Sequence, residues 1–282
     1  MKRQKRVMAI HDISGFGKCS LTVALPIISA AGIETTALPT AVLSTHTGGL
    51  TGFTYRDLTS DLLPIAEHWK SLNLKFDALY SGFLGSFEQL DIVSKIFDMF
   101  KEGNNITLID PVMADNGEMY KLFSSDFAEG MARLCAKGDV IVPNITEAVF
   151  MLKEDYVEGP YSKEYVNNLL KKLVKLGPKK VVLTGVFFDE DSLGAATYDS
   201  NEGEISYQMS DRIEGYYHGT GDVFGSALLA ALMNGKSLSE SAKIAVDFTT
   251  SSIKRTKFAG TDVRFGVNFE ESLPSLIAAI NG

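Results

Sequence analysis

The sequence contains few cysteines. Cys19 and Cys135 are the only two in 282 residues, and they lie far apart without a metal-ligand spacing. This scarcity excludes a small disulfide-stapled scaffold and a cysteine zinc site. We interpret both cysteines as reduced thiols of a cytoplasmic protein. Burial as small apolar side chains is favoured over a disulfide or a catalytic role.

The sequence also lacks an excess of positive charge and a long apolar run. Lys and Arg number 27 against 35 Asp and Glu, which gives a net charge of −8 at pH 7. An acidic chain has no long-range attraction for nucleic acid or anionic lipid. The basic start Met1–Arg6 has no apolar signal core after it, and no run approaches the roughly 20 residues that span a bilayer. We therefore expect no nucleic-acid partner, no membrane partner and a cytoplasmic location.

What the sequence does contain is a regular alternation of short apolar runs and amphipathic segments. The predicted strands are Lys5–His11, Ile33–Leu38, Ala78–Phe83, Ile106–Pro111, Asp139–Pro143 and Lys179–Val186. The predicted helices are Leu21–Ala31, Phe87–Phe100, Phe123–Ala136 and Lys163–Leu176, each followed by a glycine stop signal. This alternation predicts an α/β fold with a mostly parallel central sheet flanked by helices on both faces.

Two segments interrupt the alternation. Residues Thr40–Thr54 are too rich in glycine and threonine for a helix, and they predict an extended flap or hairpin. Residues Gly194–Arg212 alternate apolar and polar side chains around Asn201-Glu202-Gly203, which predicts an antiparallel hairpin. With no repeat, linker or low-complexity tract, residues 1–282 are predicted to form a single domain.

The stretch HDISGFGKCS (residues 11–20) imitates a phosphate-binding loop. In a Walker A loop, Lys18 would follow a glycine correctly, but Cys19 stands where the magnesium-binding hydroxyl is needed and Asp12 stands where the first glycine is needed. A dinucleotide fingerprint fails because Ser20 stands in place of its third glycine. The remaining signal is a turn at the carboxyl end of the first strand, where open α/β sheets bind ligands. There Ser14 either faces a ligand or caps the turn.

A better anion site is HGTGDVFG (residues 218–225), which opens the apolar helix Phe224–Met233. Glycines let the backbone approach a ligand, and the first helical turn leaves N–H donors unpaired beside the positive end of the helix dipole. Residues 219–222 could thus stabilise a transferring phosphoryl group. At such a helix end we expect Asp222 to be ionised and only weakly basic. An aspartate there can also serve helix stability alone.

Polar side chains follow three further strands. Asp110 ends one apolar strand, Asn144 and Glu147 follow the next, and Thr184 ends a third. Carboxylates at the carboxyl ends of consecutive strands suit Mg²⁺ with retained waters. Each residue alone is explained by helix capping or turn formation, but together with the helix start at Gly219–Asp222 they predict one shared crevice.

An ordered set of motifs runs through the chain: HDISGFGKCSLT, LSTHTGG, YSGFLGS, DPVMADNGEMY, PNITEA, LTGV and GTGDVFG. With these motifs the sequence resembles the ribokinase superfamily from end to end, and specifically its pyridoxal (pyridoxamine) kinase branch. The resemblance implies a ribokinase-like three-layer sandwich with a small β flap. It implies ATP-dependent phosphorylation of the 5′-hydroxymethyl group of B6 vitamers in vitamin B6 salvage, forming pyridoxal 5′-phosphate. It also implies Mg²⁺, a candidate monovalent cation, and a homodimer whose flap helps to close the substrate site.

The resemblance assigns roles to individual residues of this sequence. Asp222 is implied to take the proton of the substrate hydroxyl as the catalytic base, with Gly219, Thr220 and Gly221 as the anion hole. Ser14, Thr47, Phe83 and Asp222 match substrate-binding positions, and His46 beside the flap threonine either reaches the substrate or has a structural role. Asp110, Asn144, Glu147 and Thr184 match ATP-binding positions, with Asp110 and Glu147 also facing the metal.

One departure from the family pattern affects the substrate. Phe83 stands where several members carry tyrosine, so ring packing is kept and a phenol hydrogen bond is lost. The preferred vitamer is therefore open, and a hydroxymethylpyrimidine kinase of the same superfamily is an alternative. A non-catalytic B6-binding protein is a second alternative, but it has no need of the base and metal-site residues. The sequence lacks the motifs expected of a sugar kinase and of an NAD-dependent dehydrogenase.

Overall fold

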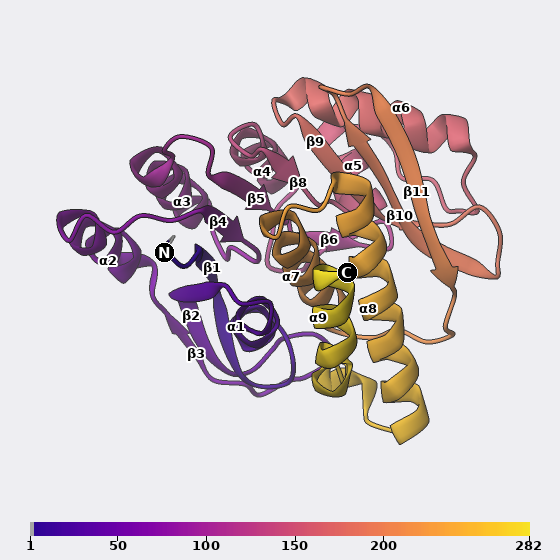
Figure 1. Ribbon diagram of the computed structural model, residues 1–282, viewed down its shortest axis with the longest axis horizontal. Coiled ribbons are helices and arrows are strands. Elements are labelled where there is room, and N and C mark those ends of the chain that lie inside the picture. Colours follow the sequence, from indigo (N-terminus) through magenta and orange to yellow (C-terminus); the bar gives the residue numbers. More distant parts are fainter. Residues whose placement is uncertain (1–2) are drawn as a thin grey trace. The chain divides into compact units, whose positions relative to one another are not determined.

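The computed structural model describes residues 3–282, which divide into two compact units. The first unit consists of the chain up to Tyr80 together with Ile213–Gly282, and the second is Ser81–Arg212. In Figure 1 the first unit therefore combines the indigo and purple start of the chain with its orange and yellow end. The single domain expected over residues 1–282 stays a prediction.

The sheet of the first unit has the strand order β4-β1-β2-β3. Its strands are β1 (Arg6–Phe16), β2 (Glu34–Thr45), β3 (Tyr55–Asp57) and β4 (Ala78–Ser81). β1 and β2 are parallel, and β3 is antiparallel to β2. Both long strands run further than their apolar cores predicted, because their pairing continues to Phe16 opposite Thr45 beyond a bulge between His11 and Ile13. The expected flap thus begins as the end of β2.

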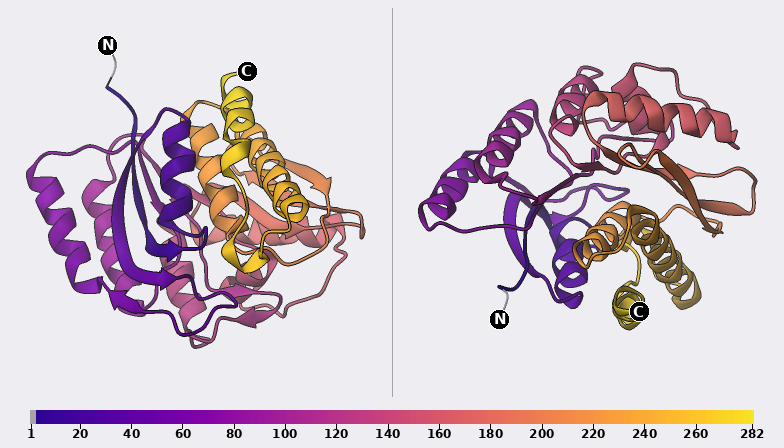
Figure 2. Two further views of the ribbon diagram at one scale, coloured as in Figure 1. Left: turned by 90° about the horizontal axis from the view of Figure 1, so that it is seen from below. Right: turned by 45° about the horizontal axis from the view of Figure 1, so that its top comes forward.

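The helices of this unit are α1 (Leu21–Ala30), α2 (Thr59–Ser71), α7 (Thr220–Met233), α8 (Leu238–Ala259) and α9 (Leu273–Asn281). α1 packs on β1 and β2 and contacts α7, which in turn lies alongside α8 (Figure 2). Local sequence patterns did not predict α2, α8 and α9. A signal for α8 was present, since Ser237 and Glu240 form a capping box at its start.

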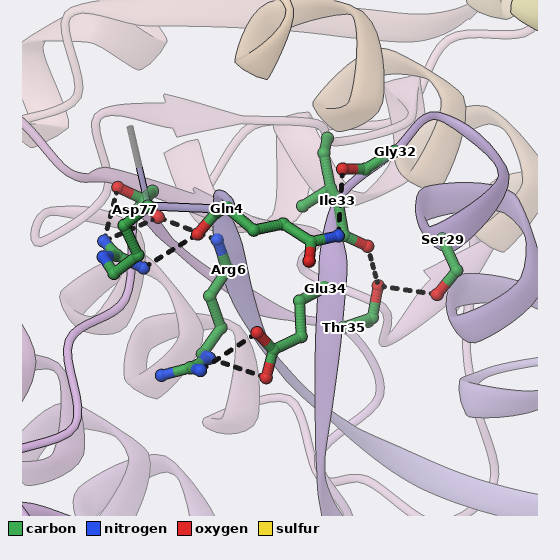
Figure 3. A network of polar contacts seen from close by, with 9 residues as sticks. Gln4, Arg6, Ser29, Gly32, Ile33, Glu34, Thr35 and Asp77 are labelled. Atoms are coloured by element: carbon green, nitrogen blue, oxygen red, sulfur yellow. Dashed lines mark hydrogen bonds and ion pairs between the residues drawn. The ribbon is translucent and has the colours of Figure 1, made fainter. Parts of the chain in front are cut away.

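A polar network fixes the beginning of the first sheet (Figure 3). The backbone N–H of Arg6 donates to Asp77 Oδ2 at 2.7 Å, and the N–H of Asp77 donates back to the Arg6 carbonyl at 2.7 Å. The Arg6 guanidinium donates to Glu34 Oε2 at 2.9 Å. These contacts set the register of β1, and β1 leads to the residues of interest at its carboxyl end.

The sheet of the second unit has the order β11-β10-β9-β8-β5. Its strands are β5 (Ile106–Ile109), β8 (Val140–Ile141), β9 (Lys180–Val186), β10 (Ser192–Asp199) and β11 (Glu204–Asp211), with a separate hairpin of β6 (Ala114–Asp115) and β7 (Glu118–Met119). β8 is parallel to β5 and β9, whereas β10 is antiparallel to both of its neighbours. The predicted hairpin around Asn201-Glu202-Gly203 is confirmed.

The helices of the second unit are α3 (Phe87–Phe100), α4 (Phe127–Cys135), α5 (Ile145–Leu152) and α6 (Lys163–Leu173). Short 3₁₀ turns cover Val174–Leu176 here and Val263–Phe265 and Glu270–Ser272 in the first unit. α5 and α6 pack on β9 (Figure 1). The α/β class with a mostly parallel sheet flanked by helices is confirmed. Within residues 3–282 no helix is long and apolar enough to cross a membrane.

Candidate active site

The N-terminus of α7 is built by a close contact between two glycine-containing loops. Gly219 precedes the helix with φ +76°, and a Cβ there would lie 2.0 Å from the carbonyl oxygen of Lys18. Only glycine tolerates both the left-handed backbone and this approach. The first helical turn, Thr220-Gly221-Asp222, then carries N–H groups at the positive end of a 14-residue helix. The chain therefore begins a helix where the sequence predicted one, and the anion-binding role of this turn stays a prediction.

Asp222 lies in this turn with a side chain that is 15% exposed. Burial raises the pKa of its carboxyl to about 7, the negative charge of Asp12 adds to the rise, and a hydrogen bond from the Ser20 N–H opposes it. The expectation of an ionised, weakly basic aspartate is thus corrected: desolvation outweighs the helix end. A carboxyl with a pKa near neutrality is suited to accept a proton.

Asp12 is a second buried acid, and its charge acts on Asp222. The sequence pattern predicted no site role for Asp12. Its carboxylate accepts hydrogen bonds from Ser20 Oγ at 2.6 Å and Ser14 Oγ at 3.1 Å. Burial raises the pKa of Asp12, and these two hydroxyl donors partly offset the rise. Ser14 is completely buried and its hydroxyl faces Asp12. Its substrate-binding role stays a prediction.

Lys18, in the stretch that imitates a phosphate-binding loop, forms hydrogen bonds to other parts of the protein. Its ammonium donates to Asn268 Oδ1 at 2.9 Å and to Glu270 Oε2 at 2.8 Å, and its backbone N–H donates to the Phe265 carbonyl. These bonds tie the loop after β1 to the segment before α9. The ammonium of Lys18 therefore joins two segments of the first unit, in agreement with the absence of a Walker A motif around it.

The flap after β2 is anchored to the loop that precedes α7. The His46 and His218 rings lie 5.3 Å apart, and a Cβ on Gly48 would lie 2.5 Å from His218 Nδ1. His46 Nε2 donates to the Arg264 carbonyl at 2.5 Å, while its Nδ1 accepts the Gly48 N–H at 3.1 Å. Both ring nitrogens of His46 are thus hydrogen-bonded, one within the flap and the other to the 3₁₀ turn that contains Arg264. A vitamer contact of His46 stays a prediction.

Thr47 differs from its neighbour because its side chain is exposed at the tip of this flap. The sequence pattern predicted neither His218 nor Arg264 as a site residue. The position of His218 next to Gly219 was a weak sequence signal for a site residue. No local sequence feature indicated Arg264. The structure therefore places Ser14, His46, Thr47 and Gly219–Asp222 in one unit, on β1, the flap and α7.

The second unit holds the remaining predicted residues. Asn144 caps α5: its Oδ1 accepts the Glu147 N–H at 2.8 Å, and Glu147 Oε2 accepts the Asn144 N–H at 2.9 Å. Glu147 Oε1 accepts the Met113 N–H at 3.1 Å. Asn144 and Glu147 therefore form a complete capping box, which is a structural role. It does not exclude a ligand, because each carboxylate oxygen has a second lone pair.

Asp110 and Glu147 form a buried acidic pair, with 6% and 3% of their surfaces exposed. Burial raises the pKa of Glu147, and the charge of Asp110 raises it further. A divalent cation would relieve this repulsion, so the donor set fits Mg²⁺ held by one or two carboxylates, with water and phosphate oxygens in its other positions. Among residues 3–282, no group of three or more His, Cys, Asp or Glu is arranged to hold a metal by itself.

Thr184 and Phe83 complete the predicted set. Thr184 on β9 forms a bridge with Asn144, and its N–H donates to the Pro143 carbonyl at 2.9 Å. Asp110, Asn144, Glu147 and Thr184 are thus neighbours within the second unit. Phe83 lies in the same unit, in an aromatic cluster with Phe123 at 5.7 Å between ring centroids. The shared crevice expected for both sets stays a prediction.

Comparison with known proteins identifies the family. The model of the phosphomethylpyrimidine kinase family matches residues 25–266. The chain belongs to this family. Pyridoxal kinase PdxY of Histophilus somni is 28% identical over 274 residues, which cover 91% of each chain. The chain is therefore a kinase, and its resemblance to ribokinase-like enzymes of the B6 branch is confirmed.

Solved structures with the same fold include two bacterial proteins. One is a putative phosphomethylpyrimidine kinase from Bacteroides thetaiotaomicron in a crystal form with pyridoxal, at 36% identity and a TM-score of 0.93, covering 97% of this chain and 96% of that one. The other is pyridoxal kinase from Lactobacillus plantarum, at 29% identity and a TM-score of 0.89, covering 98% of both chains.

Proposed function

We propose that this kinase transfers the γ-phosphoryl group of ATP to the 5′-hydroxymethyl group of pyridoxal and related B6 vitamers. The observation that carries the proposal is Asp222 in the first turn of α7, with a carboxyl pKa raised to about 7 at the N-terminal end of the helix. A base and an anion site in one helical turn suit a hydroxyl that attacks phosphorus. The similarity to a protein crystallised with pyridoxal supports the substrate class.

The reaction follows from these residues. The substrate hydroxyl oxygen forms a bond to the γ-phosphorus, the bond from that phosphorus to the β-γ bridging oxygen breaks, and ADP leaves. Asp222 accepts the hydroxyl proton, and the N–H groups of Gly219, Thr220 and Gly221 stabilise charge on the phosphoryl oxygens. Phosphoryl transfer has a loose transition state, so positioning and charge stabilisation dominate over base strength.

The second unit would serve the nucleotide. Asp110 and Glu147 would hold Mg²⁺, partly through water, and the metal would supply charge neutralisation of the phosphate oxygens. Asn144 and Thr184 would contact the nucleotide phosphates, while Ser14, Thr47, His46 and Phe83 would contact the vitamer. A monovalent cation is a further candidate cofactor. Because ATP is the donor, a cytoplasmic location belongs to the same proposal.

The deciding experiment is a substrate panel with the purified chain, ATP and Mg²⁺, read out by ADP release and by mass of the product. Pyridoxal, pyridoxamine, pyridoxine and hydroxymethylpyrimidine are compared at equal concentrations. Preferred turnover of a B6 vitamer is expected. Preferred turnover of hydroxymethylpyrimidine would replace the proposal by the function that the family name describes, and vitamer binding without ADP release would indicate a non-catalytic binder.

The assignment of the base has its own test. Asp222→Asn is expected to lower kcat by about 10²- to 10⁴-fold, the usual contribution of a positioned acid–base group. ATP binding measured by calorimetry should be nearly unchanged. Asp91→Asn, at an exposed aspartate on α3, is the matched control and should retain full turnover. Near-normal turnover of Asp222→Asn would remove Asp222 from the mechanism.

A further inference from the structure

His11 is a completely buried histidine on β1. Neither ring nitrogen has a hydrogen-bond partner among the residues that the structure describes. Buried polar atoms are normally paired because an unmade hydrogen bond is costly, so an unpaired imidazole requires an explanation. The carboxyl of Asp222 lies close by, with its Oδ1 3.9 Å from His11 Nδ1.

The strand and its neighbours fix the ring in this place. A bulge between His11 and Ile13 breaks the regular alternation of β1, and bulges re-aim side chains. The Tyr80 ring on β4 meets the imidazole edge-on, with the ring centroids 4.4 Å apart. Tyr80 in turn reaches α7 at Gly225, where an added Cβ would lie 2.5 Å from its hydroxyl. Asp222 and Gly225 are one turn apart on α7, so the same helical face carries both contacts.

We infer that His11 is a positioning residue for Asp222: its neutral ring points Nδ1–H at the carboxylate and thereby aims the other carboxylate oxygen at the substrate hydroxyl. The inference rests on the proposed function, because it takes Asp222 as the base. The 3.9 Å separation shortens to a hydrogen bond with a small rotation of the Asp222 side chain, as catalytic contacts commonly do when substrate binds.

The charge state of His11 matters for this role. Burial lowers the pKa of His11 to about 3, so the ring is neutral at physiological pH. An imidazolium at this distance would depress the pKa of Asp222 strongly and make it a poor base, whereas a neutral donor orients it at a smaller cost in basicity.

Several other groups act on Asp222 and must be separated from His11. Asp12 on β1 raises its pKa through charge, and the Ser20 N–H lowers it. The Cys19 thiol is kept protonated because burial and the charges of Asp222 and Asp12 raise its pKa. Tyr80 faces His11 from β4. These groups are present in every variant of a His11 series, so a comparison of ring and amide substitutions at His11 tests its own contribution.

The test compares His11→Phe, which keeps a flat ring without a donor, with His11→Asn, whose amide can donate near the position of Nδ1. Loss of a hydrogen bond to the charged form raises a carboxyl pKa, so the acid limb of kcat/KM for the vitamer should move up by about half a pH unit or more in His11→Phe. His11→Asn should stay close to the native profile. KM for ATP should change little in both.

Ser226→Ala is the matched control, since Ser226 also has a buried hydroxyl on α7 without a partner in the described part of the chain. It should leave the acid limb in place. An unmoved acid limb in His11→Phe, or equal impairment of His11→Asn and His11→Phe, would overturn the inference. If the native chain turns over no vitamer, the proposed function fails first, which is a different result.

A second measurement does not depend on a folded His11 variant or on turnover. In protein labelled with ¹⁵N-histidine, one ring should remain neutral from about pH 5 to 9, as a deeply desolvated histidine does. The ring nitrogen shifts of that histidine should change in Asp222→Asn. The inference would be contradicted if every histidine ring titrated in this range. It would also be contradicted if the ring shifts were the same in Asp222→Asn as in the native protein.

Discussion

Asp222 shows how a residue's chemistry depends on its surroundings. Its place at a helix N-terminus favours the ionised form, yet burial raises its pKa to about 7. A base is active when deprotonated, so activity should be lost as pH falls through the raised pKa. We expect kcat/KM for the vitamer to rise between about pH 6 and 8 and then level off. Initial rates across this range test the prediction, and a flat profile would contradict it.

At Gly219, steric contacts restrict the side chain to that of glycine. A Cβ would lie 2.0 Å from the Lys18 carbonyl in a left-handed conformation. Gly219→Ala should therefore lower the free energy of unfolding by about 2–3 kcal/mol or more, since backbone must move. Gly235→Ala is the control: it has a similar positive φ but nothing within 4 Å, and should cost only about 1 kcal/mol.

Chemical denaturation of both glycine variants gives the comparison directly. Equal losses of stability would show that backbone strain alone, rather than contact with the loop after β1, constrains Gly219. Vitamer turnover should fall only in Gly219→Ala, because only this change displaces the first turn of α7.

At the scale of elements, two capping boxes allow structure and function to be separated. Asn144 and Glu147 begin α5, and Ser237 and Glu240 begin α8. Asn144→Ala and Ser237→Ala should each cost about 1 kcal/mol of stability, the usual value for an N-cap. Only Asn144→Ala should lower kcat/KM for ATP, if this end of α5 serves the nucleotide. Denaturation curves and ATP-dependent rates measure the two effects.

Equal ATP kinetics in the two cap variants would leave Asn144 as a structural cap. A selective fall in Asn144→Ala would support its nucleotide role, because the matched loss of stability in Ser237→Ala removes general destabilisation as the cause.

Elements were predictable from sequence where local signals were strong. The strand that became β9 and the helices α3 and α6 follow from apolar runs and glycine stops. β1 and β2 extend beyond their apolar cores because inter-strand pairing, a non-local interaction, continues after the hydrophobic pattern ends. α2 and α9 were missed, and their weaker local patterns are supported by packing on other elements.

At the scale of the whole molecule, the family resemblance implies a homodimer, which we keep as a prediction. Light scattering with size-exclusion chromatography should give twice the chain mass at assay concentrations. A monomer that retains full vitamer turnover would show that a single chain completes the site. The net charge of −8 favours solubility at neutral pH during such measurements.

The sequence by itself determined the α/β class, the helix start at residues 219–222 and, through its ordered motifs, the kinase family. These depend on local spacing and on residue types that a chain carries wherever it folds. Only the tertiary structure decided the raised pKa of Asp222, the hydrogen bonds of Lys18 to Asn268 and Glu270, and the burial of His11 beside Asp222. Burial and charge at one atom are set by segments far apart in the chain, which no local pattern records.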